Sequence, residues 1–481
     1  MASTVSTEFR KWSPLSLRTR QVLEIKIFLQ SLFQPSISLL SLDPSTRASG
    51  RSARVIASMG LSALSTVVAM STNLLLVPLT IQYLGQERYG VWIVLSSLST
   101  LLGVATLGLG SGLQNAVSGA AGRDDWTTAA RYVSTAFIFV SVIAAGALLV
   151  LMCISVLLSW PGILNVHDSG LRTEVHIAAV SVFSLCLASL PIAILQRTQA
   201  ALLQGFVPDA WRAVGSFLTL VTVYMATQAK ASLPTLVILL SGIPVLTASV
   251  NVVLAFRTAN ASLRPRLKYF DWHLCKELTA DGALFTTSQA SQLVMSVAPV
   301  FIAARLFGVA TAGCVGLVQK LTQLPTAGIS LIGLALWPAF TEAEAHGDLQ
   351  WIRAATRRLA YGAAFAILFL VPVTAAVTPR VVHVWSRAGL EAPFSLAAAF
   401  AALTALIVIR GSLSLPVVSS GRILVPGTAM PIAAAIGLAP LVAPHLWASP
   451  TSVILWLAVC ELVPIVIFTI TLREWMSRLL L

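Results

Sequence analysis

The chain has 481 residues, of which 57% are hydrophobic and only 10% are charged. Charged residues make up about a quarter of a typical soluble domain, so this composition excludes a soluble globule and indicates a polytopic membrane protein. The formal net charge of +13 is assigned to basic loops that orient the protein in the membrane, and a nucleic-acid partner is excluded. The five cysteines are scattered singly, so neither a metal site nor a disulfide framework is predicted.

Residues 1–55 precede the first apolar run and carry many serines and eight Lys or Arg residues between Arg10 and Arg54. No cleavage-site pattern follows a short apolar core, so no signal peptide is predicted. We expect a basic, disordered cytoplasmic tail or an overextended gene start. A transit peptide or a helix lying on the membrane surface is the weaker alternative.

Runs of about 20 apolar residues, the length that spans the hydrocarbon core, recur along the rest of the chain. They predict twelve transmembrane helices near residues 56–82, 89–112, 132–157, 176–204, 209–229, 233–257, 283–306, 309–339, 357–378, 395–419, 425–445 and 451–472. The predicted fold class is an all-α polytopic membrane protein.

The basic residues predict the orientation. An even number of spans places both termini on one side, and most Lys and Arg residues fall on that side even when the first 55 residues are ignored. The opposite side receives only Arg88, Arg172, Lys230, Arg305, Arg380 and Arg387. By the positive-inside rule the termini are cytoplasmic.

The two halves of the chain resemble each other. Gly85 and Gly90 bracket a short polar elbow between the first two spans, and Gly308 and Gly313 bracket the corresponding elbow of the second half. The motif pairs Trp126 and Trp351, and Pro191 and Pro416, are separated by the same number of residues. These matches predict a duplicated six-helix unit, with lobes at 56–257 and 283–481 and a cytoplasmic linker at 258–282. Because six is even, the lobes are parallel and surround a central cavity.

Polar side chains inside the spans are the candidate functional residues, because a charge at membrane depth is costly and usually faces a cavity or a partner. The cations are Arg197, Arg305, Lys320 and Arg410. Glutamines form two stripes beside them, Gln289 with Gln292 and Gln319 with Gln323. Glu461 is the only acid deep in the last span.

The segment PLTIQYLGQERYGVWIVLSSLSTLLGVATLGLGSGLQN, from Pro78 to Asn115, resembles the first helix pair of bacterial polysaccharide flippases of the multidrug/oligosaccharidyl-lipid/polysaccharide exporter superfamily. The elbow LGxxxYGxW at Leu84–Trp92 and the LGLG at 107–110 carry the resemblance. Many relatives have an acid just before the LGLG, where this chain has Thr106, which argues against a coupling role for the second helix.

The resemblance implies that the chain flips an undecaprenyl-pyrophosphate-linked oligosaccharide across the bacterial inner membrane by alternating access, for biosynthesis of lipopolysaccharide or exopolysaccharide. It implies a monomer surrounded by membrane lipids, with a polysaccharide polymerase and a chain-length regulator as further partners. No cofactor is implied, although an H⁺ or Na⁺ gradient could drive transport.

On this interpretation the four cations and the glutamine stripes line the cavity and bind the pyrophosphate through charge-assisted hydrogen bonds. The alternative for Arg197, Arg305 and Arg410 is snorkelling to the headgroups, whereas Lys320 is too central to snorkel easily. Glu461 is either an ion-coupling carboxylate or a protonated, hydrogen-bonded helix residue.

Two other function classes stay open. A cation-coupled drug or metabolite antiporter of the same superfamily shares the fold, but it is expected to use acidic residues in its lumen. A membrane-embedded glycan polymerase or ligase needs a large outer loop, and the longest outer loops predicted, 158–175 and 379–394, are short. An enzyme is therefore not predicted.

Overall fold

The computed structural model describes residues 44–481, apart from residues 158, 165, 167–168, 203, 259, 281–282, 325, 327–335, 337–339, 341–342, 344–347, 387–390, 420–421, 423 and 479–481. These residues form helices and short connections, with no β-strand among them. Nine helical stretches within the described residues are long and apolar enough to cross a membrane. The remaining three predicted spans correspond to the second part of α3 with α4, to α8 and to α12. The predicted all-helical membrane fold is confirmed.

The first half of the chain contains six long helices joined by short turns. They are α3 (Pro44–Leu102), α4 (Val104–Gly122), α5 (Trp126–Leu157), α7 (Ser169–Ala201), α8 (Phe206–Gln228) and α9 (Leu233–Arg257), with the single turn α6 (Trp160–Ile163) before α7. Helix α3 begins inside the stretch 1–55 for which a tail was predicted. Residues 1–43 of that stretch lie outside the described residues.

The segment between the halves is tied to α5. It contains η3 (Ala261–Leu263), η4 (Leu267–Tyr269) and α10 (Trp272–Ala280). Arg131 donates to Asp271 at 2.7 Å, and the Tyr132 hydroxyl bonds Glu277 at 3.1 Å. The backbone N–H of His273 and the Arg131 guanidinium lower the pKa of Asp271 below its ordinary value. This carboxylate therefore stays charged near neutral pH and holds the segment on the first half of the chain.

The described residues of the second half also form helices joined by short connections. Its helices are α11 (Ala283–Phe307), α12 (Val309–Thr322), α14 (Leu349–Phe365), the π-helical turn η5 (Ala366–Leu370), α15 (Val371–Ser386), α16 (Phe394–Ser419), α17 (Leu424–Gly437), α18 (Ala439–Val442), η6 (Pro444–Leu446), α19 (Pro450–Cys460) and α20 (Leu462–Arg478). Most of residues 323–339, the rest of the predicted eighth span, lies outside the described residues.

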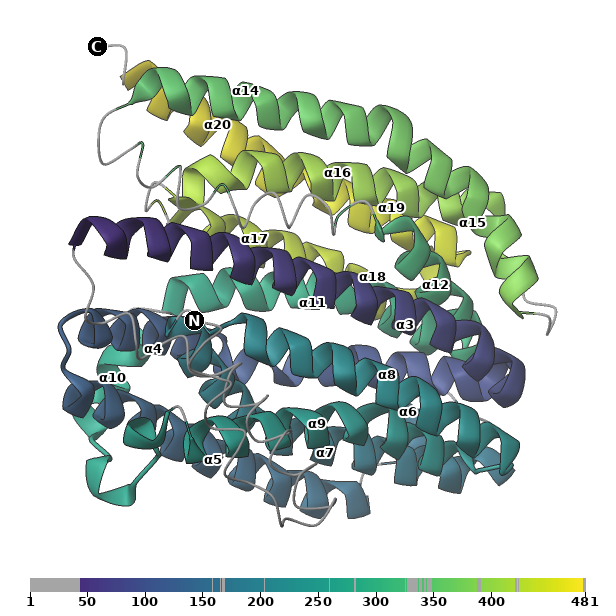
Figure 1. The fold of residues 1–481 in the computed structure, drawn as a ribbon. Helices are drawn as coiled ribbons and strands as arrows, with labels where there is room; N and C mark the ends of the chain where they lie inside the picture. Colours follow the sequence, from purple (N-terminus) through teal and green to yellow (C-terminus); the bar gives the residue numbers. More distant parts are fainter. Residues whose placement is uncertain are drawn as a thin grey trace, which may run out of the picture.

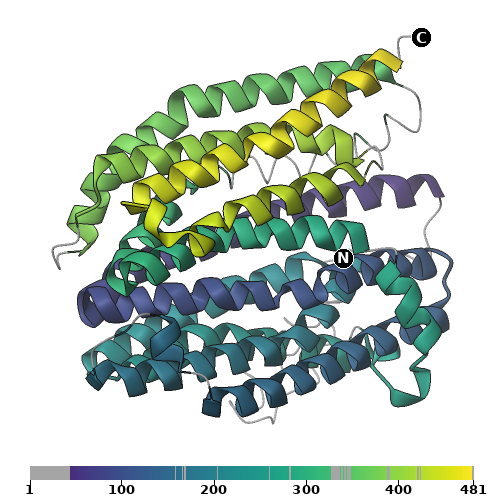
Figure 2. The ribbon, with the colours of Figure 1, turned by 180° about the vertical axis from the view of Figure 1, so that it is seen from behind.

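The helices form two groups with α3 and α11 between them (Figure 1). One group contains α4, α5, α7, α8 and α9, and the other contains α14 to α20; the view from behind shows the same division (Figure 2). Helix α3 packs against α8 of its own half and against α11 and α12 of the other half. One hydrophobic cluster crosses this boundary and includes the fully buried Ile81, Val94, Val315 and Leu317. The groups are therefore joined through the apolar faces of α3, α11 and α12.

The two elbows that the sequence pairs as repeats lie against each other. Gly85 and Gly308 both have positive φ, 74° and 90°, a region that glycine adopts without the steric cost of a Cβ. Past these bends, a Cβ on Gly90 would overlap the carbonyl oxygen of Val309, and a Cβ on Gly313 would lie 3.1 Å from the Cα of Gly90. Glycine is required here because the two backbones touch.

Gly90→Ala is expected to force the elbows apart and to lower the free energy of unfolding by about 1–3 kcal/mol, the usual cost of overpacking. Gly146→Ala on α5 is the matched control, because nothing lies within 4 Å of the added Cβ. The measurement is the thermal unfolding midpoint of each variant in detergent. Equal midpoints for both variants would contradict the backbone contact.

Candidate functional site

A buried ion pair lies at the centre of the second half. Nε of Arg410 on α16 donates to Oε2 of Glu461 at 2.7 Å, and the two side chains are only 11% and 2% exposed. Arg410 lies 16 residues past the start of α16 and Glu461 lies 11 residues past the start of α19. At 1.5 Å per residue these positions are about 24 Å and 17 Å along helices that cross a core roughly 30 Å thick. The pair therefore lies well inside the span.

Glu461 occupies a break between two helices. Helix α19 ends at Cys460 and α20 begins at Leu462. Pro464 has no backbone N–H to donate to the carbonyl of Cys460, so the helical ladder is interrupted at this turn. The break places the carboxylate against α16, where the Arg410 side chain meets it.

Two glutamines extend the network to α11. Nη1 of Arg410 donates to Oε1 of Gln292 at 3.3 Å, and Nε2 of Gln292 donates to Oε1 of Gln289 at 3.2 Å. These polar side chains from three helices satisfy one another, as buried polar groups must. The sequence singled out all four residues as candidates, and the structure joins them in one chain of hydrogen bonds.

A cavity of about 190 Å³ opens beside this network. Residues from α11, α16, α17 and α20 line it: Ser288, Gln289, Gln292, Arg410, Ser414, Val418, Pro426, Met430 and Phe468. The guanidinium and two glutamine amides face a space whose other walls include Met430 and Phe468. Such a cavity can hold a small polar group next to a fixed positive charge.

Lys320 lies apart from that network. It is exposed, whereas every other residue from Ala312 to Thr322 on α12 is buried. Helix α12 packs against α3, α11, α15 and α16. The Lys320 side chain is therefore exposed on a helix that other helices cover along most of its length. Lys320 makes no hydrogen bond or ion pair with any described residue.

The other predicted cations are also exposed. Arg197, near the end of α7, crosses the face of Gly110 on α4, with its Cγ 3.4 Å from the place a Cβ would occupy. Arg305 lies near the end of α11 that precedes the elbow. Within the described residues neither arginine has a hydrogen-bond or ion-pair partner. The structure therefore separates Arg197, Arg305 and Lys320 from the paired Arg410.

The two glutamines of the second stripe, Gln319 and Gln323, lie in different environments. Nε2 of Gln319 donates to the backbone carbonyl of Ser296 at 2.9 Å and is buried between α12 and α11. Gln323 caps the C-terminal end of α12 and is half-buried. Gln319 therefore joins two helices of the same half, while Gln323 lies one turn from Lys320.

Sequence reasoning did not single out four other neutral polar residues, Ser288, Ser414, Gln199 and Asn251. Ser288 and Ser414 line the cavity. In the first half, Gln199 and Asn251 exchange two hydrogen bonds, 3.3 and 3.0 Å, between α7 and α9, and both are fully buried. A serine scarcely changes the hydropathy of a span, whereas the side-chain amides of Gln199 and Asn251 at membrane depth are a polar signal that could have pointed to an interhelical hydrogen bond.

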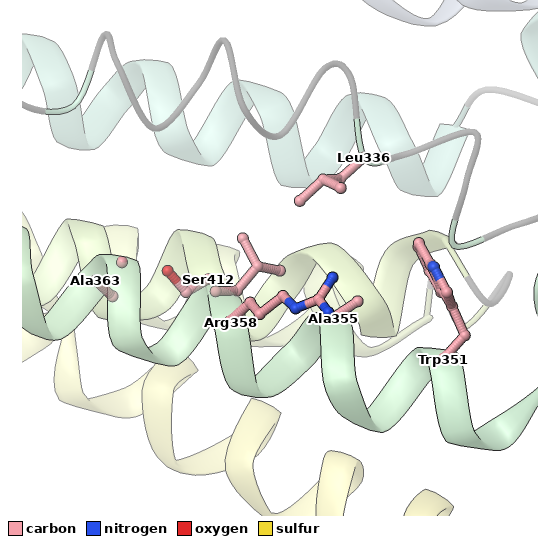
Figure 3. Close-up of a pocket in the computed structure, with 8 residues that line it drawn as sticks. Leu336, Trp351, Ala355, Arg358, Ala363 and Ser412 are labelled. Carbon is pink, nitrogen blue, oxygen red and sulfur yellow. The ribbon is translucent and has the colours of Figure 1, made fainter.

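A second cavity, of about 220 Å³, lies between α14 and α16. Figure 3 shows Trp351, Ala355 and Ala363 on one side and Leu336 opposite, with the Arg358 guanidinium among them. Its walls are mostly apolar. This cavity has no contact with Arg410, because Ser412 is the residue of α16 that reaches it.

The sequence matches no protein-family model and no curated protein sequence. Solved structures do match over most of the chain. The inward-facing conformation of a multidrug resistance MATE family transporter of the MOP superfamily aligns with a TM-score of 0.63 and 16% identity, covering 86% of this chain and 98% of the other. The chain has a MATE-like transporter fold.

Two further structures give the same result. The outward-facing conformation of a multidrug resistance MATE family transporter has a TM-score of 0.61 and 14% identity, covering 93% of this chain and 99% of the other. A MOP superfamily transporter from Pyrococcus furiosus, described as having a binding pocket of reverse polarity that suggests a different function, matches with the same values. The structures compared here are transporters rather than enzymes. At these identities the likeness establishes the MATE-like fold alone.

Lys320→Cys, placed in a chain whose five native cysteines are replaced, is expected to react with a water-soluble maleimide, because the side chain at this position is exposed. Val318→Cys is the matched control, since Val318 is 0% exposed two residues away on the same helix. Labelling is read by mass shift on intact membranes. Equal reactivity of the two cysteines would contradict the exposure of Lys320.

Proposed function

We propose that this chain is an alternating-access membrane transporter whose cargo is an anionic, lipid-linked oligosaccharide, carried between leaflets during biosynthesis of cell-surface polysaccharide. The observation that carries the proposal is the exposed and unpaired ammonium of Lys320 on an otherwise buried helix. An unpaired charge at membrane depth is costly, so its presence favours a ligand of opposite charge. The pyrophosphate of a polyprenyl carrier supplies that charge.

The balance of charges supports an anionic cargo. Arg197 is exposed and unpaired within the described residues, as is Lys320, whereas the intramembrane acid, Glu461, is buried against Arg410. A site that concentrates a cationic drug would need the opposite sign. The flippase-like motif at Leu84–Trp92 supports the same cargo class independently of the charges.

A drug or metabolite antiporter is the second candidate, and a specific observation favours it: two of the matching structures are described as multidrug resistance transporters. The two candidates differ in the sign of the cargo. Retention of transport after loss of the intramembrane cations would favour the antiporter.

The proposed setting is the bacterial inner membrane, with both termini in the cytoplasm. The chain would work as a monomer without a cofactor, beside a polysaccharide polymerase and a chain-length regulator, and an H⁺ or Na⁺ gradient would supply the energy. The two helix groups lie on either side of α3 and α11 (Figure 1), and the contact between the two elbows suits a rocking motion of the groups about it.

Lys320→Ala and Arg197→Ala are each expected to lower glycan export at least about tenfold, since each removes a charge-assisted contact to phosphate. Arg380→Ala is the control, because Arg380 is exposed and its guanidinium donates to the backbone carbonyl of Ala376 one turn away. Export is measured by surface polysaccharide staining at matched expression. Normal export by both test variants would exclude the cationic cargo site.

The orientation has its own test. A reporter that is active only in the periplasm, fused after Gly308 at the elbow, is expected to be active, and the same reporter fused after Trp351 is expected to be silent. A cytoplasmic reporter at the same two positions serves as the reciprocal control. The reverse pattern would place the termini outside.

A further inference from the structure

The ion pair of Arg410 and Glu461 is not required by the duplicated fold. Arg410 lies six residues before Pro416, and the residue six before Pro191 in the first half is Leu185. Glu461 begins the sequence Glu-Leu-Val-Pro at 461–464, and its counterpart at 241–244 is Ser-Gly-Ile-Pro. In the first half, Leu185 packs 3.7 Å from the place a Cβ on Gly242 would occupy. The positions that correspond to Arg410 and Glu461 are therefore uncharged in the first half, where they hold Leu185 and Ser241.

Packing alone does not explain why the second half keeps the Arg410–Glu461 ion pair. Withdrawing two charges from water costs several kcal/mol each, and apolar replacements of buried ion pairs are often neutral or stabilising. The first half has uncharged residues at the corresponding positions, Leu185 and Ser241. A retained pair beside a cavity therefore points to ligand binding.

The Arg410 guanidinium has more hydrogen-bond donors than its described partners use. Of its five N–H donors, one bonds Glu461 and one bonds Gln292. Arg410 also lines the 190 Å³ cavity together with Gln289, Ser288 and Ser414. A planar fork of donors facing a polar cavity matches the geometry of a phosphoryl group.

We infer that this cavity binds a phosphoryl group on Arg410 and that binding transfers one proton to Glu461. The inference rests on the proposed anionic cargo and supplies its coupling. The phosphoryl oxygens accept from the guanidinium in place of the Glu461 carboxylate. A carboxylate that is 2% exposed and has lost its cation takes a proton from water, because an unpaired buried charge is too costly to keep.

No other charged group among the described residues replaces Arg410 as the ion-pair partner of Glu461. Cys460 is the titratable neighbour in sequence, and α17 carries none. The helices packed around the pair carry Arg305 on α11, Lys320 on α12, Arg353, Arg357 and Arg358 on α14, Arg380 and His383 on α15, and Arg473 and Glu474 on α20. Within the described part of the chain, no ion pair joins any of these residues to Glu461, and none of them lines this cavity.

The test is calorimetry of the purified full chain with inorganic pyrophosphate, and separately with farnesyl pyrophosphate, in two buffers of different ionisation heat. Comparing the buffers yields the number of protons taken up per anion bound. Wild type is expected to take up about one proton more than Glu461→Gln, in which the carboxylate cannot titrate. Equal proton uptake by the two proteins would overturn the inference. Binding of farnesyl pyrophosphate alone would assign the site to a lipid headgroup, and binding of both ligands to the phosphoryl group itself.

Arg410→Leu combined with Glu461→Ser reproduces the residues of the first half and leaves no buried charge, so it is expected to fold. It should weaken pyrophosphate binding about tenfold or more, and unchanged binding by this folded variant would overturn the inference. Arg380→Ala, at an exposed residue that does not line this cavity, should retain both binding and proton uptake, and loss of either would also overturn it. If the chain exports glycan but wild type and Glu461→Gln take up equal numbers of protons, the coupling is refuted and the proposed function stands. If binding is proton-linked but no glycan is exported, the proposed function is refuted and the coupling stands.

Discussion

The contact between the two elbows is the constraint on which the rest of the structure depends. Gly90 and Gly313 bring the backbones of α3 and α12 together, and helices that approach this closely cannot slide without separating. The glycines at 85 and 308 turn each chain segment so that the next helix runs back alongside. The same four glycines therefore determine both the path of each helix pair and the place where the two halves meet.

The elbow contact does not involve the buried polar residues deeper in each half, and these residues differ between the halves. In the first half the buried polar pair is neutral, because the side-chain amides of Gln199 and Asn251 each donate to the other. The second half uses Arg410 and Glu461, whose charges neutralise each other only while they remain in contact. The two halves thus differ in their buried polar groups, because one carries a neutral amide pair and the other carries an ion pair.

The sequence predicted the helices and the elbow glycines because their signals are local. An apolar run identifies a span whatever surrounds it, and a glycine at a tight bend is recognisable from its neighbours. Which side chains meet across helices depends on the rotation of each helix, which hydropathy does not specify. Gln319 and Lys320 are adjacent in the chain, yet one bonds the carbonyl of Ser296 while the other is exposed. Likewise, Arg410 and Glu461 were selected separately, for cargo and for coupling, and their pairing followed only from the structure.

In the proposed transporter, the two kinds of cation have different roles in binding. An unpaired cation such as Lys320 attracts an anion without releasing anything, so it adds affinity in any conformation in which it can be reached. Arg410 cannot bind an anion fully without giving up Glu461, so its affinity depends on whether the surrounding helices let the carboxylate accept a proton. A ligand shifts a conformational equilibrium only through interactions that differ between the two states. Of the intramembrane cations described, Arg410 is the one whose contacts necessarily differ, and for that reason the ion pair is the suitable element to link cargo binding to movement of the helix groups.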